Sequence, residues 1–131
     1  MKKLFICCPM KGRTEENIRI SMKQMHKYAE IIFDQELEVI PTYIEDNPPD
    51  NSNQAIWYLG ESIKKLAEAD FFIGIEYTDI FRGCSVESDV ARQYGIRSTF
   101  VNYREMMTDI VEIERKLWEA EYKAVLPNPI G

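Results

Sequence analysis

The feature that most constrains the fold is an alternation of short apolar runs with longer segments of helical periodicity. The clearest runs, at residues 4–8 and 71–75, are five residues long and apolar throughout apart from Gly74, as expected for strands that are buried in a parallel sheet. Each run is followed by a segment in which apolar residues recur three or four positions apart, which is typical of an amphipathic helix. The predicted strands cover residues 4–8, 37–40, 71–75 and 97–101, and the predicted helices cover residues 14–33, 54–67, 85–94 and 104–123.

This alternation predicts an α/β fold with a doubly wound parallel sheet of about four to five strands, in a flavodoxin- or Rossmann-like three-layer sandwich. Right-handed crossovers lead to the strand order 2-1-3-4, which places the topological switch point between the first and third strands. The 131 residues suit one domain, and the sequence shows no repeat, low-complexity segment or domain boundary. We therefore predict a single domain over residues 1–131.

Charge and cysteine content narrow the class of protein. The formal net charge of −6 argues against a general nucleic-acid-binding protein, which needs a basic surface. No apolar run approaches the length of a membrane span. The three cysteines have no zinc-site spacing, and Cys7 and Cys8, as neighbours on a strand, should point to opposite faces. We expect a reduced, cytoplasmic protein with no metal or other cofactor, and with neither a nucleic-acid polymer nor a membrane as its partner.

Two loops and one helix start converge on the predicted switch point. The turn at residues 9–13 and the loop at residues 76–85 both follow strands, and ligands bind above the carboxyl ends of strands in such sheets. Gly83 permits a tight turn, Ser85 is a good N-cap, and Glu87 falls in the first helical turn, near the positive end of the helix dipole. Glu87 could therefore meet a substrate, or it could simply cap and solubilise the helix start.

Basic residues on the predicted crevice are notable in an acidic protein. Lys11, Arg13 and Arg82 could bind a phosphate or a carboxylate, helped by backbone N–H groups at the helix starts, or they could be solvated surface charges. The turn at residues 9–12 is not a Walker loop, because it lacks the spacing and the terminal Lys-Ser/Thr pair.

Other reactive or aromatic side chains have weaker claims. Cys84 lies near a helix start, which can lower the pKa of a thiol, but the only histidine, His26, lies within the first predicted helix. Cysteine-histidine catalysis is therefore not expected. Trp57, Tyr58 and Tyr77 could stack on a base, or they could pack in the core or in an interface.

The order and spacing of these motifs resemble those of the nucleoside 2-deoxyribosyltransferase-like superfamily, and most closely its short bacterial and phage branch. The resemblance covers roughly residues 3–101. The matching residues are Ile6, Cys7, Cys8, Pro9, Met10, Lys11 and Gly12, then Ala69 and Asp70 before a strand, then Gly83, Cys84, Ser85, Val86 and Glu87, with Ala91 and Gly95 after them.

The resemblance implies an enzyme that cleaves or transfers the N-glycosidic bond of a nucleoside or a nucleoside monophosphate. Glu87 would attack the anomeric carbon, and Asp79 or Glu61 would supply an acid for the leaving base or orient the substrate. The resemblance also implies dimers or larger homo-oligomers with shared sites. The residues expected to hold the sugar or phosphate are Pro9, Met10, Lys11, Gly12, Arg13, Arg82, Gly83 and Ser85.

The sequence departs from this family pattern at two points. No aspartate stands close before Gly83, since Asp79 is the nearest and Arg82 lies between them. Active members often carry an aspartate eight residues before the one that matches Asp70, and here that position is Ser62. Glu61 is adjacent, but neighbours on a helix point about 100° apart. One alternative is therefore a non-catalytic protein that senses or sequesters a nucleotide-derived signal, for example in a phage. Another alternative is a purely structural oligomeric protein.

Overall fold

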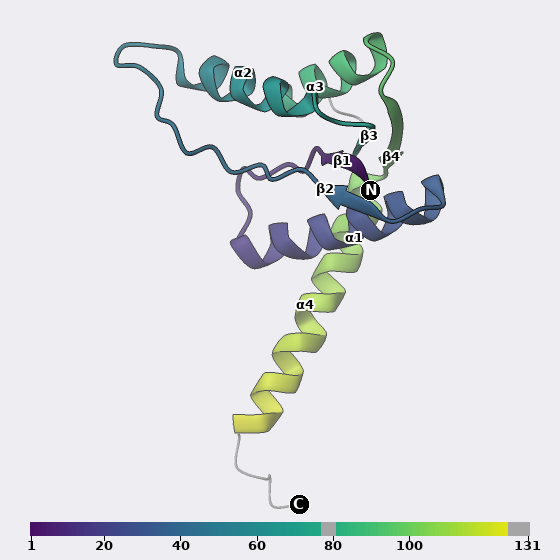
Figure 1. Cartoon of the computed structure of the whole chain (residues 1–131). Coiled ribbons are helices and arrows are strands. Elements are labelled where there is room, and N and C mark those ends of the chain that lie inside the picture. The colour runs from purple at the N-terminus through teal and green to yellow at the C-terminus, as the bar shows by residue number, and fades with distance from the viewer. Residues whose placement is uncertain (77–80, 126–131) are drawn as a thin grey trace, which may run out of the picture.

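The chain folds into a four-stranded parallel sheet with two helices on each face, as the computed structural model in Figure 1 shows. The structure describes residues 1–76 and 81–125. The strands are β1 (Lys2–Ile6), β2 (Leu37–Val39), β3 (Phe71–Ile75) and β4 (Arg97–Val101). The helices are α1 (Glu15–Phe33), α2 (Gln54–Leu66), α3 (Arg82–Gln93) and α4 (Tyr103–Val125).

The strand order is β2-β1-β3-β4 and every pairing is parallel, which confirms the predicted α/β class and order. Leu4 of β1 pairs with Phe71 of β3, which in turn pairs with Arg97 of β4. All five residues of β3 are buried, because this strand lies inside the sheet with helices on both sides. The edge strand β4 is only partly covered.

Alternate residues of the central strands feed two separate cores. Leu4 packs on the face covered by α1 and α4, whereas Phe5 packs on the face covered by α2 and α3, where its ring stacks on Phe72 at 5.8 Å between centroids. The same alternation continues past β1, so Cys8 joins the first core and Cys7 the second. The predicted divergence of these two cysteines is therefore confirmed.

Helix α1 begins as the sequence predicts. The Thr14 hydroxyl accepts a hydrogen bond of 3.1 Å from the backbone N–H of Asn17, which satisfies one of the free donors at a helix start. The spacing of Met25, Ala29 and Ile32 by four and three predicts one apolar stripe, but Ile32 is exposed while Ile20, Met25 and Ala29 are buried. The covered face is thus rotated slightly from the one that spacing alone indicates.

The predicted start of α3 is wrong by three residues. The helix begins at Arg82 rather than at Ser85, and the backbone N–H of Ser85 already closes a helical turn onto the carbonyl of Phe81. Gly83 therefore lies within the first turn of the helix and not in a tight loop, and Glu87 lies in the second turn. Burial of Cys84 against the sheet outweighs the poor helix propensity of glycine here.

Two further glycines mark contrasting environments. Gly95 has φ +75° just after α3, a left-handed conformation that favours glycine, so it ends the helix as glycines commonly do at this position. Gly60, in the middle of α2, has open space where a side chain would stand, so we find no close packing there.

In the described part of the chain, no helix combines the length and the apolar character that crossing a membrane would require.

Candidate active site at the switch point

The topological switch point lies where the chain leaves β1 and β3 toward opposite faces of the sheet. β1 leads into α1, which packs with α4 on one face, and β3 precedes α3, which packs with α2 on the other face. The ends of these neighbouring strands therefore diverge, which is the arrangement in which doubly wound sheets bind ligands. Cys7, just after β1, marks this point, since its backbone N–H still bonds to the carbonyl of Ile73 in β3 at 2.8 Å.

Glu87 is a partly buried carboxylate beside Cys7 at this switch point. The hydroxyl of Ser62, on α2, donates a hydrogen bond of 2.7 Å to its Oε1, and the thiol of Cys7 gives a second hydrogen bond. Burial raises the pKa of Glu87 above its usual value, while both hydrogen bonds act in the opposite direction. Three segments of the chain thus hold one carboxylate in a fixed orientation.

The thiol of Cys7 is held in the neutral form. A hydrogen bond between Cys7 and Cys84, burial and the nearby Glu87 carboxylate together raise the pKa of Cys7 far above that of a free thiol. All three cysteines of the chain are free and buried. Cys7 therefore acts as a hydrogen-bond donor to Glu87 rather than as a nucleophile.

The loop after β1 is shaped by Arg13, whose side chain folds back onto its own loop and helix. The guanidinium has five N–H groups, and each has an acceptor nearby. The acceptors are the carbonyl of Pro9 (2.7 Å), the thiol sulfur of Cys8 (3.5 Å), Oδ1 of Asn17 (2.6 Å), the carbonyl of Asn17 (3.2 Å) and the hydroxyl of Ser21. Asn17 in turn donates to Oε1 of Glu114 on α4 at 3.2 Å.

The remaining loop residues lie at the surface. Pro9 is buried, whereas Met10 and Lys11 are exposed, and Gly12 takes the left-handed φ of +75° that the turn requires. At the other side, Arg82 and Gly83 are exposed at the start of α3, and Ser85 is half-buried one turn later. Lys11 and Arg82 therefore have exposed side chains, while the donors of Arg13 are already engaged.

Of the two predicted acids, Glu61 is not the residue that contacts Glu87. The carboxylate of Glu61 accepts a hydrogen bond of 2.8 Å from Lys64 on the same helix, and its neighbour Ser62 is the residue that contacts Glu87. Asp79 and Tyr77 lie outside the described residues. Asp70 accepts a hydrogen bond of 2.8 Å from the backbone N–H of Lys3, which is a structural role.

The aromatic and histidine candidates have local partners. Trp57 and Tyr58 meet edge to face with 5.0 Å between ring centroids, on α2. His26 lies 2.8 Å from the carbonyl of Leu37, which ties α1 to β2. Within residues 1–76 and 81–125, no cluster of three or more His, Cys, Asp or Glu side chains could hold a metal ion.

Sequence reasoning missed the partners of Glu87. Ser62 was noted only as a departure from a family pattern, yet this position lies directly against the carboxylate. The available signal was its position four residues before Leu66, because residues four apart lie on the same face of a helix and Leu66 is buried. Cys7 could have been found from strand alternation, which directs it to the same face of the sheet as α3.

Comparisons with known proteins add no further assignment: no family model, curated protein or solved structure matches the chain. The candidate function therefore depends on the geometry at Glu87 and on the sequence motifs.

Proposed function

We propose that the protein binds a nucleoside or a nucleotide at the switch point and cleaves or transfers its N-glycosidic bond, with Glu87 as the nucleophile. The observation that carries this proposal is the hydrogen bond of 2.7 Å from Ser62 to Glu87, which fixes a partly buried carboxylate at the divergent ends of β1 and β3. The motifs around Glu87 resemble those of the nucleoside 2-deoxyribosyltransferase-like superfamily.

The chemistry suits a carboxylate held in this way. Cleavage of a glycosidic bond passes through a transition state with positive charge on the sugar, and a nearby carboxylate stabilises that charge before it bonds to the anomeric carbon. Ser62 and Cys7 favour the ionised form of Glu87, which is the form that attacks. Partial burial strengthens the attraction between this carboxylate and the sugar, because fewer water molecules screen it.

The exposed basic residues would hold the anionic part of the substrate. Lys11, on the loop after β1, and Arg82, at the start of α3, both have exposed side chains near the helix starts. Backbone N–H groups at such starts favour a phosphate. In this proposal Gly12 allows close approach of the loop backbone, and Arg13 keeps the loop in shape without contacting the ligand.

A second candidate function is binding of a nucleotide without catalysis. The observation that favours it is the hydroxyl of Ser62 against Glu87, where the family pattern has a carboxylate. A serine cannot act as the acid that a departing base requires. Glu61 is paired with Lys64 and so does not take this place.

The test is base release from a panel of nucleosides and nucleoside monophosphates, measured for the wild type and for Glu87→Gln. Asp89→Asn is the matched control, because Asp89 is an exposed carboxylate on the same helix. Release that vanishes in Glu87→Gln and persists in Asp89→Asn supports the enzyme. A glycosyl adduct on Glu87, detected by intact mass, would identify the nucleophile.

The other outcomes separate the two functions. Thermal stabilisation by a nucleotide without release of base favours the binding protein, and Ser62→Asp then tests whether an added carboxylate confers release. If no member of the panel is cleaved or stabilises the protein, both functions are wrong.

We also place the protein in the cytoplasm, since Cys7, Cys8 and Cys84 are free thiols, and we infer a homo-oligomer.

A further inference from the structure

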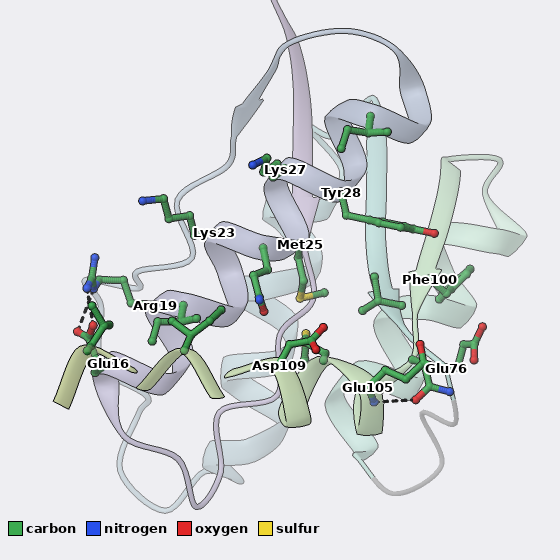
Figure 2. A pocket seen from close by; sticks show the side chains of 18 residues that line it. Glu16, Arg19, Lys23, Met25, Lys27, Tyr28, Glu76, Phe100, Glu105 and Asp109 are labelled. Carbon is green, nitrogen blue, oxygen red and sulfur yellow. Dashed lines mark hydrogen bonds and ion pairs between the residues drawn. The ribbon is translucent and has the colours of Figure 1, made fainter. Parts of the chain in front are cut away.

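A groove of about 910 Å³ lies between α1 and α4 (Figure 2). None of the predicted site residues that the structure describes lines it. Apolar side chains from three elements line the groove, among them Ile20 and Tyr28 of α1, Val101 of β4 and Ile113 of α4. The groove is thus a second concave surface, separate from the switch point.

The groove is long and its walls are open to solvent. On α1 the lining residues run from Glu16 to Ile31, a distance of about 22 Å at 1.5 Å per residue. Ile31 on one wall is 67% exposed, and Leu117 on the other wall is 49% exposed. A small-molecule site encloses most of the surface of its ligand, which walls as exposed as these do not. An elongated segment of a macromolecule therefore fits this groove better than a small ligand.

The shape of the groove is set by two helices. On α4 the lining residues Met106, Asp109, Ile113 and Leu117 recur three or four positions apart, so they form one stripe along the helix. Figure 1 shows the C-terminal half of α4 extending away from the sheet, so this wall continues past the core. A third helix can pack against two such stripes, because helices pack with their axes 8–10 Å apart. The groove therefore suits a helical segment.

The unpaired charges of the groove are segregated by wall. Lys23 and Lys27 lie on the side formed by α1, whereas Glu105 and Asp109 lie on the side formed by α4, with Glu76 beside them (Figure 2). All five side chains are exposed, and no ion pair within residues 1–76 and 81–125 engages any of them. Each wall can therefore still pair with charges on an occupant.

The two other charged residues on the α1 wall neutralise each other. The guanidinium of Arg19 lies 2.5 Å from the carboxylate of Glu16, one helical turn earlier. This pair adds no net charge to the wall, so Lys23 and Lys27 decide its sign. The α1 wall is therefore basic and the α4 wall acidic.

We propose that this groove binds an amphipathic helix of another protein. The apolar stripe of that helix lies along the groove, its acidic flank faces Lys23 and Lys27, and its basic flank faces Glu105 and Asp109. Recognition of a helix in a groove uses apolar residues at helical spacing, and like charges at either wall would weaken it. The inference depends neither on the proposed function of Glu87 nor on the number of copies of the chain in an assembly.

The first test measures the binding of synthetic helices to the full-length protein by fluorescence anisotropy. The split-charge peptide is a lactam-bridged helix of about 16 residues, roughly 24 Å long, with one leucine stripe, glutamates on one flank and lysines on the other. The mixed-charge peptide has the same composition, but both of its flanks carry both charges. Mixing is the proper control, because exchanging the flanks only reverses the direction of the helix. We expect the split-charge peptide to bind at least about fivefold more tightly.

The second test removes the apolar contacts. Ile31→Glu and Leu117→Glu should each raise the dissociation constant of the split-charge peptide at least about tenfold. Both residues are exposed, so both variants should keep the wild-type circular dichroism spectrum. Ile56→Glu is the matched control, because Ile56 is 66% exposed but lies on α2, and it should bind the peptide as the wild type does.

The third test changes the sign of one wall. In Lys23→Glu/Lys27→Glu both walls are acidic, so this variant should prefer a peptide with lysines on both flanks to the split-charge peptide. The wild type should prefer the split-charge peptide. If both proteins rank the two peptides in the same order, the proposed charge arrangement is wrong.

The remaining outcomes also decide the question. A wild type that does not bind the split-charge peptide, or that binds the mixed-charge peptide equally well, would overturn the proposal. Light scattering during size-exclusion chromatography should give Ile31→Glu and Leu117→Glu the molar mass of the wild type. A lower mass in both variants would overturn the proposal too, because the groove would then be a contact between copies of the chain.

Discussion

The hydroxyl of Ser62 and the carboxylate of Glu87 are joined by a hydrogen bond of 2.7 Å, although the residues are 25 positions apart and lie on different helices. This contact links α2 to α3 at the candidate site. It also means that the protonation of Glu87 depends on a neighbour that has no charge of its own.

Ser62→Ala should raise the pKa of Glu87 further, because the hydrogen bond from Ser62 lowers it in the wild type. Carbon-13 NMR titration of the Glu87 carboxyl measures this directly. Ser98→Ala is the control, since the hydroxyl of Ser98 bonds to the carbonyl of Ile96 and not to Glu87. A Glu87 titration that is unchanged in Ser62→Ala would contradict the contact.

Relative to the wild type, Glu87→Gln should raise the free energy of unfolding more at neutral pH than at acidic pH. Burial raises the pKa of Glu87 in the folded state above the usual value of 4.5, so the folded protein holds this proton more tightly than the unfolded chain does. Between the two pKa values the wild type loses stability as the pH rises, and glutamine removes that loss. Urea unfolding of both proteins near pH 4 and pH 7 measures the difference, and a difference independent of pH would refute the prediction.

Arg13→Lys should destabilise the protein by about 2 kcal/mol, because lysine cannot satisfy the five acceptors that the guanidinium serves. Lys11→Ala, two residues earlier and exposed, should change the free energy of unfolding by less than about 0.5 kcal/mol. Chemical denaturation of the two variants provides the measurement. Equal effects would argue that the Arg13 network contributes nothing.

Alanine at two glycines should act in opposite directions. In Gly74→Ala the new Cβ would lie 2.8 Å from a ring carbon of Phe72 and 3.3 Å from Phe100, so we expect a loss of about 1–3 kcal/mol. In Gly60→Ala the Cβ meets open space in a helix, so we expect a gain of roughly 0.5–1 kcal/mol. Thermal unfolding of both variants tests the pair, and the same sign for both would contradict it.

Local patterns were enough to predict most of the fold. The bounds of β3 and β4 match the predicted strands residue for residue, and α1 starts within one residue of the predicted position. The start of α3 was missed, because glycine and serine favour turns and caps in isolation. Burial of Cys84 and Ala91 against the sheet, which no local pattern reveals, decides that the helix begins earlier.

The candidate site was predicted less completely, since its geometry depends on contacts between distant segments. Glu87 was identified from its place after the third strand, but its partners come from α2 and from the end of β1. Arg13 was expected to face a ligand, and only the folded chain reveals that its donors are engaged by Pro9, Cys8, Asn17 and Ser21. A charge pattern alone cannot distinguish these two uses of an arginine.

The Arg13 network also has a consequence for the order of folding. Its acceptors lie four, five and eight positions away in the sequence, whereas the link from Asn17 to Glu114 spans 97 positions. Contacts between near neighbours close small loops and form quickly, while long-range contacts form late. During synthesis the loop after β1 can therefore take its final shape before α4 exists, and α4 then locks it from the far end of the chain.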